Sequence, residues 1–400
     1  MVYMAGDNNL DNNGVIDLNE MKKTGSTKDI NVIAQFDREG AGLSTKRYFL
    51  QKGTDLDADA VQSLGETNTG DPARLIDFIK WSVANYPADR YMLTLWNHGQ
   101  GWDDTDIYAE ERAAGDRLAR STCIRHALFK TSVRDAAKLS AEDGGMARAI
   151  CLDDNAKDFL DNMELKSVMA SAKAAIGHNI DIVGMDACLM SMAEVVYQIH
   201  DSVSCTVGSE ETEPLDGWPY NTILSALSKK PDMMPDALSK LIVQKYISSY
   251  RGSSNAVTHS ACNLLNSSKF VDEFKNFAAA MKDGLNDSAT QLAIASARSR
   301  VQDYEIHDNV DLVDLCKLLG GAQVPKNIKD AVRTVMEAIR GTSGMIISSG
   351  YYGAPMKNSN GLAIYFPTRD LSPLYASLDF SKETGWNDFI KEYIDVTRSR

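Results

Sequence analysis

The first two hundred residues alternate short apolar runs with amphipathic stretches. Near-continuous apolar runs occur at 31–36 and 182–185, as expected for strands that are covered on both faces. The pattern predicts strands at Val2–Ala5, Ile30–Asp37, Lys46–Gln51, Tyr91–Asn97, Ile180–Asp186 and Val203–Ser209. Because strands and helices alternate, we predict an α/β sandwich with a mostly parallel sheet.

Helical patterns fill the gaps between these strands. Asp71 and Pro72 provide an N-cap and a first-turn proline for a helix that continues through Val83. Two further helices are predicted at Glu164–Ile176 and Ser191–His200, and after about Lys229 the pattern becomes mainly helical. The later helices are predicted at Met234–Tyr250, Ser268–Lys282, Ser288–Arg300, Val310–Leu319 and Asn327–Ile339, followed by strands at Met345–Ser349 and Leu362–Phe366. We therefore divide the chain into an α/β domain, 1–228, and a mainly helical region, 229–400, whose late strands contribute to a sheet.

The stretch 103–163 breaks the alternation. A connection this long inside a compact domain is usually functional or disordered. It is rich in basic residues, namely Arg112, Arg117, Arg120, Arg125, Lys130, Arg134, Lys138 and Arg148.

Composition narrows the class of protein. The 400 residues include 42 Lys and Arg against 55 Asp and Glu, a net charge of −13. This balance argues against a nucleic-acid binder, which needs clustered basic residues, and it is compatible with a basic substrate. The sequence contains no run of about 18 apolar residues, so we expect no membrane span.

The six cysteines form no C-x-x-C pair, so neither a zinc site nor a thioredoxin-like site is indicated. In a chain of this length they do not suggest a disulfide framework. The first residues lack a charged segment followed by an apolar one, so no signal peptide is visible. Since Val2–Ala5 already has the pattern of a strand, we expect that the start was trimmed and an export signal removed.

Two predicted strands end in residues that can carry chemistry. One is followed by His98-Gly99-Gln100-Gly101, and the other ends in Asp186-Ala187-Cys188. Ligands of open α/β sheets bind beyond the carboxyl ends of the strands, and neighbouring strands lie about 4.8 Å apart. An imidazole there can take the thiol proton and later protonate a leaving amine. The backbone N–H groups of Gly99 and Cys188 could bind the oxyanion. The alternative, a buried cysteine beside a surface histidine, is equally compatible with the spacing.

Four segments together resemble the clostripain-type cysteine peptidases, family C11 of the caspase-like clan. They are 3–10 (YMAGDNNL), 96–102 (WNHGQGW), 185–190 (MDACLM) and 208–218, which contains SEETEP followed by DGW. The resemblance implies a caspase-like three-layer sandwich with a mostly parallel central sheet. It also implies Cys188 as nucleophile, His98 as general base or acid, and cleavage after Arg or Lys.

A basic P1 side chain needs a carboxylate at the floor of its pocket, because a buried cation without a partner is costly. The resemblance points to Asp186 and Asp216 as S1 carboxylates, with Glu210 and Glu211 as further candidates. The alternatives are a strand-end or helix-capping carboxylate for Asp186 and an ordinary turn residue for Asp216.

Members of the family are often made as zymogens that are cut between the catalytic His and Cys, which are 90 positions apart here. We expect self-cleavage at Arg148, with Arg120, Lys130 and Lys138 as alternatives, unless the loop is never cut. By the same resemblance we expect a secreted, periplasmic or cell-surface protein, monomeric or two-chained after processing, that acts on proteins or peptides with Arg or Lys at P1.

One metal motif has to be weighed. Asn9, Asp11, Asn13, Asp17 and Glu20 fit the spacing of an EF-hand loop. However, position one is Asn, a strand precedes it, and the stretch also has the pattern of a first helix. We therefore assign no metal ligand and expect no required cofactor, although some members of the family respond to calcium. A second functional hypothesis is a non-catalytic peptidase-like module that binds basic peptides at the cell surface through Glu210–Glu213.

Overall fold

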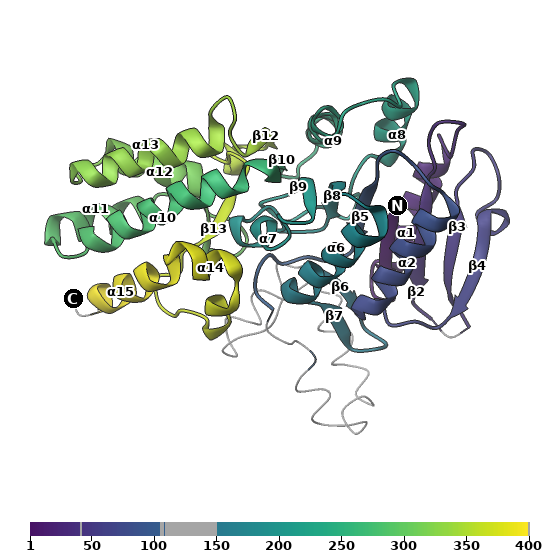
Figure 1. Cartoon of the computed structure of the whole chain (residues 1–400), viewed down its shortest axis with the longest axis horizontal. Coiled ribbons are helices and arrows are strands. Elements are labelled where there is room, and N and C mark those ends of the chain that lie inside the picture. Colours follow the sequence, from purple (N-terminus) through teal and green to yellow (C-terminus); the bar gives the residue numbers. More distant parts are fainter. Residues whose placement is uncertain (41, 105–107, 109–149, 399–400) are drawn as a thin grey trace.

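A nine-stranded sheet forms the centre of the molecule. The computed structural model describes residues 1–40, 42–104, 108 and 150–398. The sheet has the order β12-β10-β9-β8-β5-β1-β2-β3-β4. Its strands are β1 (Val2–Gly6), β2 (Ile33–Arg38), β3 (Thr45–Phe49), β4 (Ala60–Gly65), β5 (Met92–Trp96), β8 (Ile180–Asp186), β9 (Val203–Gly208), β10 (Val257–Asn263) and β12 (Ile346–Tyr352). Figure 1 shows the early strands on one side and the C-terminal helices on the other.

The five central strands, β2, β1, β5, β8 and β9, run parallel to one another. Two antiparallel strands extend the sheet on each side. The six strands predicted for the first 210 residues are present, with ends shifted by up to three residues. Strands β4 and β10 were not predicted.

Helices cover both faces of the sheet. They are α1 (Asp11–Lys22), α2 (Pro72–Asn85), α6 (Asn162–Ile176), α7 (Ala193–Gln198), α8 (Tyr220–Lys229) and α9 (Pro235–Ser249). Residues of α2, α6 and α7 belong to one buried apolar cluster, and residues of α1, α8 and α9 belong to a second. The chain is therefore a three-layer α/β sandwich, as predicted.

Local capping explains where two of these helices begin. The Asp71 carboxylate accepts a hydrogen bond from Ala73 N at 2.8 Å, and Pro72 occupies the first turn of α2. Asp161 and Glu164 form a reciprocal capping box at the start of α6. Both arrangements satisfy N–H groups that a helix start leaves without a partner.

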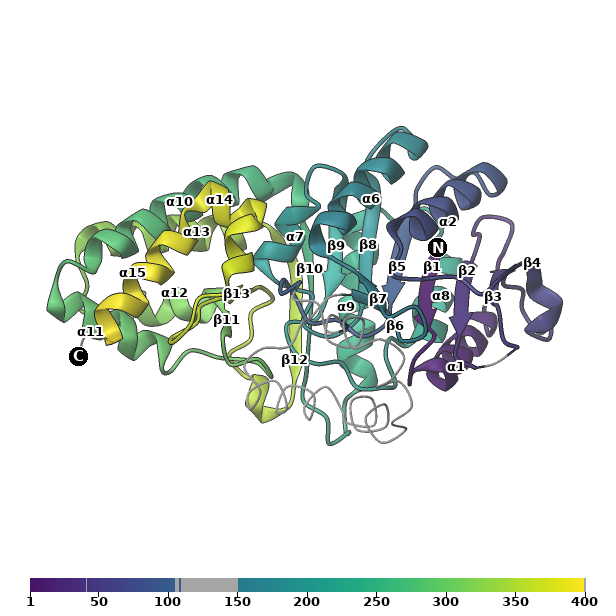
Figure 2. The ribbon, with the colours of Figure 1, turned by 90° about the horizontal axis from the view of Figure 1, so that it is seen from below.

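The C-terminal region is mainly helical and packs beside the sheet, in both Figure 1 and Figure 2. Its helices are α10 (Ser267–Gly284), α11 (Ser288–Arg298), α12 (Leu312–Gly321), α13 (Lys326–Arg340), α14 (Asp379–Thr384) and α15 (Trp386–Arg398). The predicted strand Met345–Ser349 joins the main sheet as β12. The predicted strand Leu362–Phe366 instead forms β13 (Ala363–Tyr365), which pairs with β11 (Asn309–Asp311). The boundary at residue 228 stays a prediction about folding units, and strands from both sides of it belong to one sheet.

A third sheet, which has two strands, begins at residue 150, directly after the stretch 109–149 that the structure does not describe. It consists of β6 (Ile150–Asp153) and β7 (Asp158–Leu160). None of the helices in the described ranges has the length and apolar character that a bilayer crossing requires.

Candidate active site

The loops that carry the predicted histidine and cysteine lie against each other. Strands β5 and β8 are parallel neighbours in which Trp96 is paired with Asp186, and Asn97 N donates to the Asp186 carbonyl oxygen at 3.3 Å. A Cβ added to Gly99 would lie 2.8 Å from both the Cβ of Ala187 and the carbonyl oxygen of Cys188. Only glycine allows this approach, so the strand ends that the sequence predicted to meet do meet.

The residue after the cysteine has an unusual backbone. Leu189 is fully buried and has φ of 63°, in the left-handed region, which costs a non-glycine residue of order 1–3 kcal/mol. Its N–H donates to the carbonyl oxygen of Glu211 at 3.2 Å. This turn carries the chain sharply away from β8 immediately after Cys188.

Cys188 is 6% exposed and contacts the segment 211–213. The N–H of Glu213 donates to its Sγ at 3.2 Å, and the thiol lies 3.8 Å from the carbonyl oxygen of the same residue. Burial raises the pKa of the Cys188 thiol to about 12. The sulfur is therefore a neutral thiol at neutral pH, and a base has to remove its proton before it can attack.

His98 is anchored by Asn9, which the sequence analysis named only as part of a metal motif. Its Nε2 lies 2.7 Å from Oδ1 of Asn9, in the loop after β1. Since Oδ1 is an acceptor, Nε2 carries the hydrogen and Nδ1 is the basic nitrogen. Burial lowers the pKa of His98 to about 4, so the imidazole is neutral. Asn9 could have been found only by recognising that β1 and β5 are neighbours.

Two asparagines tie the histidine loop to the strand β6. Asn97 accepts from Leu152 N at 3.1 Å through Oδ1 and donates through Nδ2 to the carbonyl oxygen of Ala5. Asn8 donates to the carbonyl oxygen of Leu152 at 2.9 Å. The flanks of His98 and of Asn9 are therefore both fixed to the same residue.

Asp186 lies at the base of the cysteine loop and is 5% exposed. Its Oδ2 accepts from the Tyr220 hydroxyl at 2.6 Å. A Cβ added to Gly217 would lie 3.2 Å from its Oδ1, and Gly217 has φ of 53°. Burial raises the pKa of Asp186 to about 6, whereas its hydrogen bond with Tyr220 lowers it. The absence of a side chain at Gly217 therefore lets the backbone of this turn approach the carboxylate closely.

The other predicted S1 residues lie in different surroundings. Asp216 is exposed and directly precedes Gly217. Glu210 accepts from the Tyr304 hydroxyl at 2.7 Å and from Gly361 N at 3.0 Å, and it lies beside Asp311. Glu211 accepts from Thr212 N at 2.7 Å and from Glu305 N at 3.3 Å. Glu210 and Glu211 thus bind the C-terminal region, whereas Asp186 and Gly217 are in contact.

The processing prediction cannot be placed on the structure. Arg148, Arg120, Lys130 and Lys138 all lie outside the described residues.

Residues 11–20 of the metal-like motif lie in the helix α1 rather than in a loop, and Asn9 lies in the turn before it. The side chains of the motif have protein partners: Asp11 accepts from Arg38 at 2.7 Å and Asp17 accepts from the Trp96 indole at 2.7 Å. Among the described residues, one other group of three acids has oxygens within 4.8 Å of one another: Asp7, Asp37 and Asp153. Asp37 already accepts from Thr45 at 2.6 Å, and Asp153 accepts from Thr69 N at 2.8 Å.

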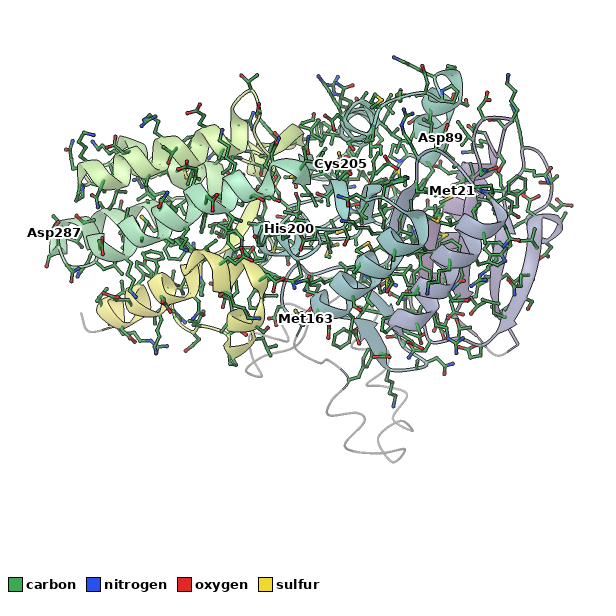
Figure 3. All side chains as sticks on the ribbon, in the orientation of Figure 1. Met21, Asp89, Met163, His200, Cys205 and Asp287 are labelled. Atoms are coloured by element: carbon green, nitrogen blue, oxygen red, sulfur yellow. The ribbon has the colours of Figure 1, made fainter. Side chains whose placement is uncertain are left out.

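The remaining described cysteines are buried free thiols: Cys151, Cys205, Cys262 and Cys316. Cys205, labelled in Figure 3, is on β9 with its Sγ 3.3 Å from Asp236. Burial raises the pKa of Cys151 and Cys262 to about 12. Of the five described cysteines, only Cys188 follows the end of a strand beside the loop that carries His98.

Comparison with known proteins finds relatives in sequence and in fold. The sequence profile of the clostripain family (peptidase C11) matches residues 2–128 and 134–393. Clostripain from Hathewaya histolytica is 24% identical over 439 residues, which cover 92% of this chain and 74% of clostripain.

Two solved structures share the fold, each at a TM-score of 0.64 and 20% identity over 96% of this chain. One is a secreted C11 cysteine protease from Bacteroides thetaiotaomicron in complex with an irreversible peptide inhibitor, of which 98% is covered. The other is an inactive zymogen C11 protease from Parabacteroides distasonis, of which 96% is covered. The sandwich described above is therefore the caspase-like fold of C11 proteases.

Proposed function

Because this chain belongs to the clostripain family of cysteine peptidases, we propose that it is an endopeptidase that cleaves after Arg or Lys through Cys188 and His98. The observation that carries the proposal is the close approach of Gly99 to Ala187 and Cys188, which brings the two loops together at the carboxyl ends of β5 and β8.

The two side chains have complementary protonation states. The thiol is protonated and the imidazole is neutral. As a substrate carbonyl arrives, the Cys188 proton passes to His98 and the sulfur forms a bond to the carbonyl carbon, giving a tetrahedral oxyanion. The imidazolium then gives its proton to the leaving amine, and the peptide bond breaks. Water hydrolyses the thioester with the same base and restores both groups.

Backbone groups at the same junction stabilise the oxyanion in this proposal. The N–H groups of Gly99 and Cys188 belong to the two touching loops, and each donor of this kind contributes roughly 10²–10³-fold in rate. The dyad and the backbone supply every proton and charge that the step needs, so the proposed reaction requires no cofactor.

Asp186 is the proposed partner for the basic P1 side chain, with Asp216 at the rim. Asp186 is buried and in close contact with the backbone of Gly217, and a buried carboxylate favours a cationic partner. The carboxylates of Glu210 and Glu211 instead accept hydrogen bonds from residues of the C-terminal region.

We also propose that the chain is a precursor that is cut at Arg148 and is active outside the cytoplasm. The support is the family membership, the solved C11 protease described as an inactive zymogen and the one described as secreted. We expect a monomer whose two chains stay together after the cut.

The direct test uses amide substrates that end in Arg, Lys or a neutral residue. Wild-type protein should release product from the first two, and Cys188→Ala should release none. The intact mass of each protein reports self-cutting, which should occur only in the wild type. Equal rates in both proteins would refute the proposal, and binding of basic peptides without turnover would support a non-catalytic module instead.

A further inference from the structure

A group of polar atoms without partners is buried behind the candidate S1 carboxylate. Among the described residues, eleven side-chain nitrogen and oxygen atoms are buried without a hydrogen-bond partner. Six of them belong to Glu213, His259, Trp218 and Tyr246. More than half of these atoms therefore come from four residues.

The four side chains are in contact. The His259 ring stacks on Tyr246 at 4.1 Å between centroids and meets Trp218 edge to face at 5.1 Å. Nδ1 of His259 lies 3.6 Å from Oε1 of Glu213. His259 is fully buried on β10, and the Glu213 side chain is 4% exposed. We call these four residues the inner polar cluster.

The inner polar cluster adjoins the proposed reaction centre. The N–H of Glu213 donates to the Cys188 sulfur, so the backbone of this residue borders the nucleophile. The Glu213 carboxyl lies beside that of Asp186, and burial and this neighbouring charge raise the pKa of Glu213 well above its usual range. A P1 side chain that reaches Asp186 therefore also reaches Glu213.

Among the described residues, no cation faces Glu213, whose carboxyl interacts with the Asp186 carboxyl and the Trp218 indole. The titratable groups that face it are Asp186 on β8, Cys188 after β8, Tyr220 on α8, Tyr246 on α9, Tyr250 directly after α9, and His259 on β10. Burial lowers the pKa of His259 to about 3, so its ring is neutral at neutral pH. A buried carboxylate without a cationic partner is costly, and it has to be balanced by a proton or by a cation that enters.

We propose that Glu213 is a second specificity-determining carboxylate of the S1 pocket, so that the P1 cation binds between Asp186 and Glu213 with His259 supporting Glu213 from behind. This inference rests on the proposed cleavage after Arg or Lys. In the empty pocket one proton bridges the two carboxyls. When the P1 cation enters, that proton leaves to solvent, so the net charge of the pocket is unchanged.

The first experiment compares kcat/KM for substrates with Arg, Lys or norleucine at P1. Norleucine keeps the length of Lys without its charge. Glu213→Gln should lose roughly 10- to 100-fold on Arg and Lys, the value of one hydrogen bond to a charged group, and should lose little on norleucine. Glu194→Gln is the matched control, because Glu194 is also buried but accepts from Tyr365 N and the Tyr375 hydroxyl. Its effect on the three substrates should be parallel.

The second experiment measures the proton directly. Cys188→Ala binds an Arg-terminated peptide in calorimetry at pH 7, in two buffers that differ in ionisation enthalpy. We expect release of close to one proton per peptide, and no release from the double variant with Glu213→Gln. Glu213→Asp, which keeps the charge, should retain part of the preference if Glu213→Gln fails to fold.

The outcomes separate the two proposals. If the wild type cleaves none of the substrates, the proposed function is wrong. If the wild type cleaves after Arg or Lys but Glu213→Gln loses all substrates equally or none, and no proton is released, Glu213 is not part of the S1 pocket.

Discussion

Gly99→Ala tests the contact on which the proposed active site depends. The added Cβ would lie 2.8 Å from the Cβ of Ala187 and from the carbonyl oxygen of Cys188, and 3.0 Å from Cγ of Met190. Carbon atoms normally approach to about 3.5 Å, so the two loops have to separate by roughly 0.7 Å. Two of the three atoms cannot rotate away, because one is backbone and one is a β-carbon.

The expected result is a large loss of activity with a smaller loss of stability. A misplacement of about 1 Å can cost about 10²-fold in rate, so we expect kcat/KM to fall roughly 10- to 100-fold. Overpacking should lower the free energy of unfolding by about 1–3 kcal/mol. Both are measured on purified protein, with an Arg-terminated amide substrate and with urea unfolding.

The control for this variant is Gly321→Ala. Gly321 ends α12, and a Cβ added there meets nothing within 4 Å. It should keep wild-type kcat/KM. A Gly99→Ala protein that folds and cleaves as fast as the wild type would refute the idea that the close approach of the two loops builds the site.

Three further predictions concern single side chains. Asn9→Ala removes the hydrogen bond to His98, so kcat should fall about 5- to 10-fold, equivalent to roughly 1 kcal/mol. The melting temperature should stay unchanged because Asn9 is exposed. An unchanged kcat would show that Asn9 does not position the ring. Asp186→Asn should lower kcat/KM for Arg substrates by roughly 100-fold but affect norleucine substrates much less, and an equal loss on both would point to a structural role. Burial and the nearby Asp153 raise the pKa of Asp7 to about 8. Between about pH 4 and pH 8 the folded state therefore holds a proton that the unfolded state has released. The free energy of unfolding falls as the pH rises through this range. Asp7→Asn should therefore raise the melting temperature more at pH 8 than at pH 5, relative to the exposed control Asp29→Asn, and an equal shift at both pH values would contradict this assignment.

The parallel strands were predictable because most of their residues are apolar, whereas the strand β10 was not predicted. Its residues Thr258, His259 and Ser260 are polar and yet buried. They are tolerated there because tertiary partners satisfy some of them: Ser209 donates to the Thr258 carbonyl oxygen at 2.8 Å, and Ser260 bonds Ser191 at 2.6 Å. Pattern alone cannot reveal a strand whose burial depends on contacts far away in the sequence.

The site was predictable as far as strand ends position it. His98, Cys188 and Asp186 each follow or end a buried strand, so their neighbourhood follows from the sheet. The acids of the segment 210–213 are close in sequence, but Glu210 and Glu211 turn to the C-terminal region and Glu213 turns to His259. The direction of each side chain depends on the irregular backbone after β9, which sequence periodicity does not describe.

The attachment of Leu152 to Asn8 and Asn97 has a consequence for a chain that is broken anywhere between 108 and 150. The strand β6 would belong to the downstream piece and is already anchored to the upstream piece. The two pieces would also share the interior of one sheet, because β5 comes from the first and β8 from the second. Such a nick would leave a non-covalent heterodimer whose halves melt in a single transition and separate only in denaturant.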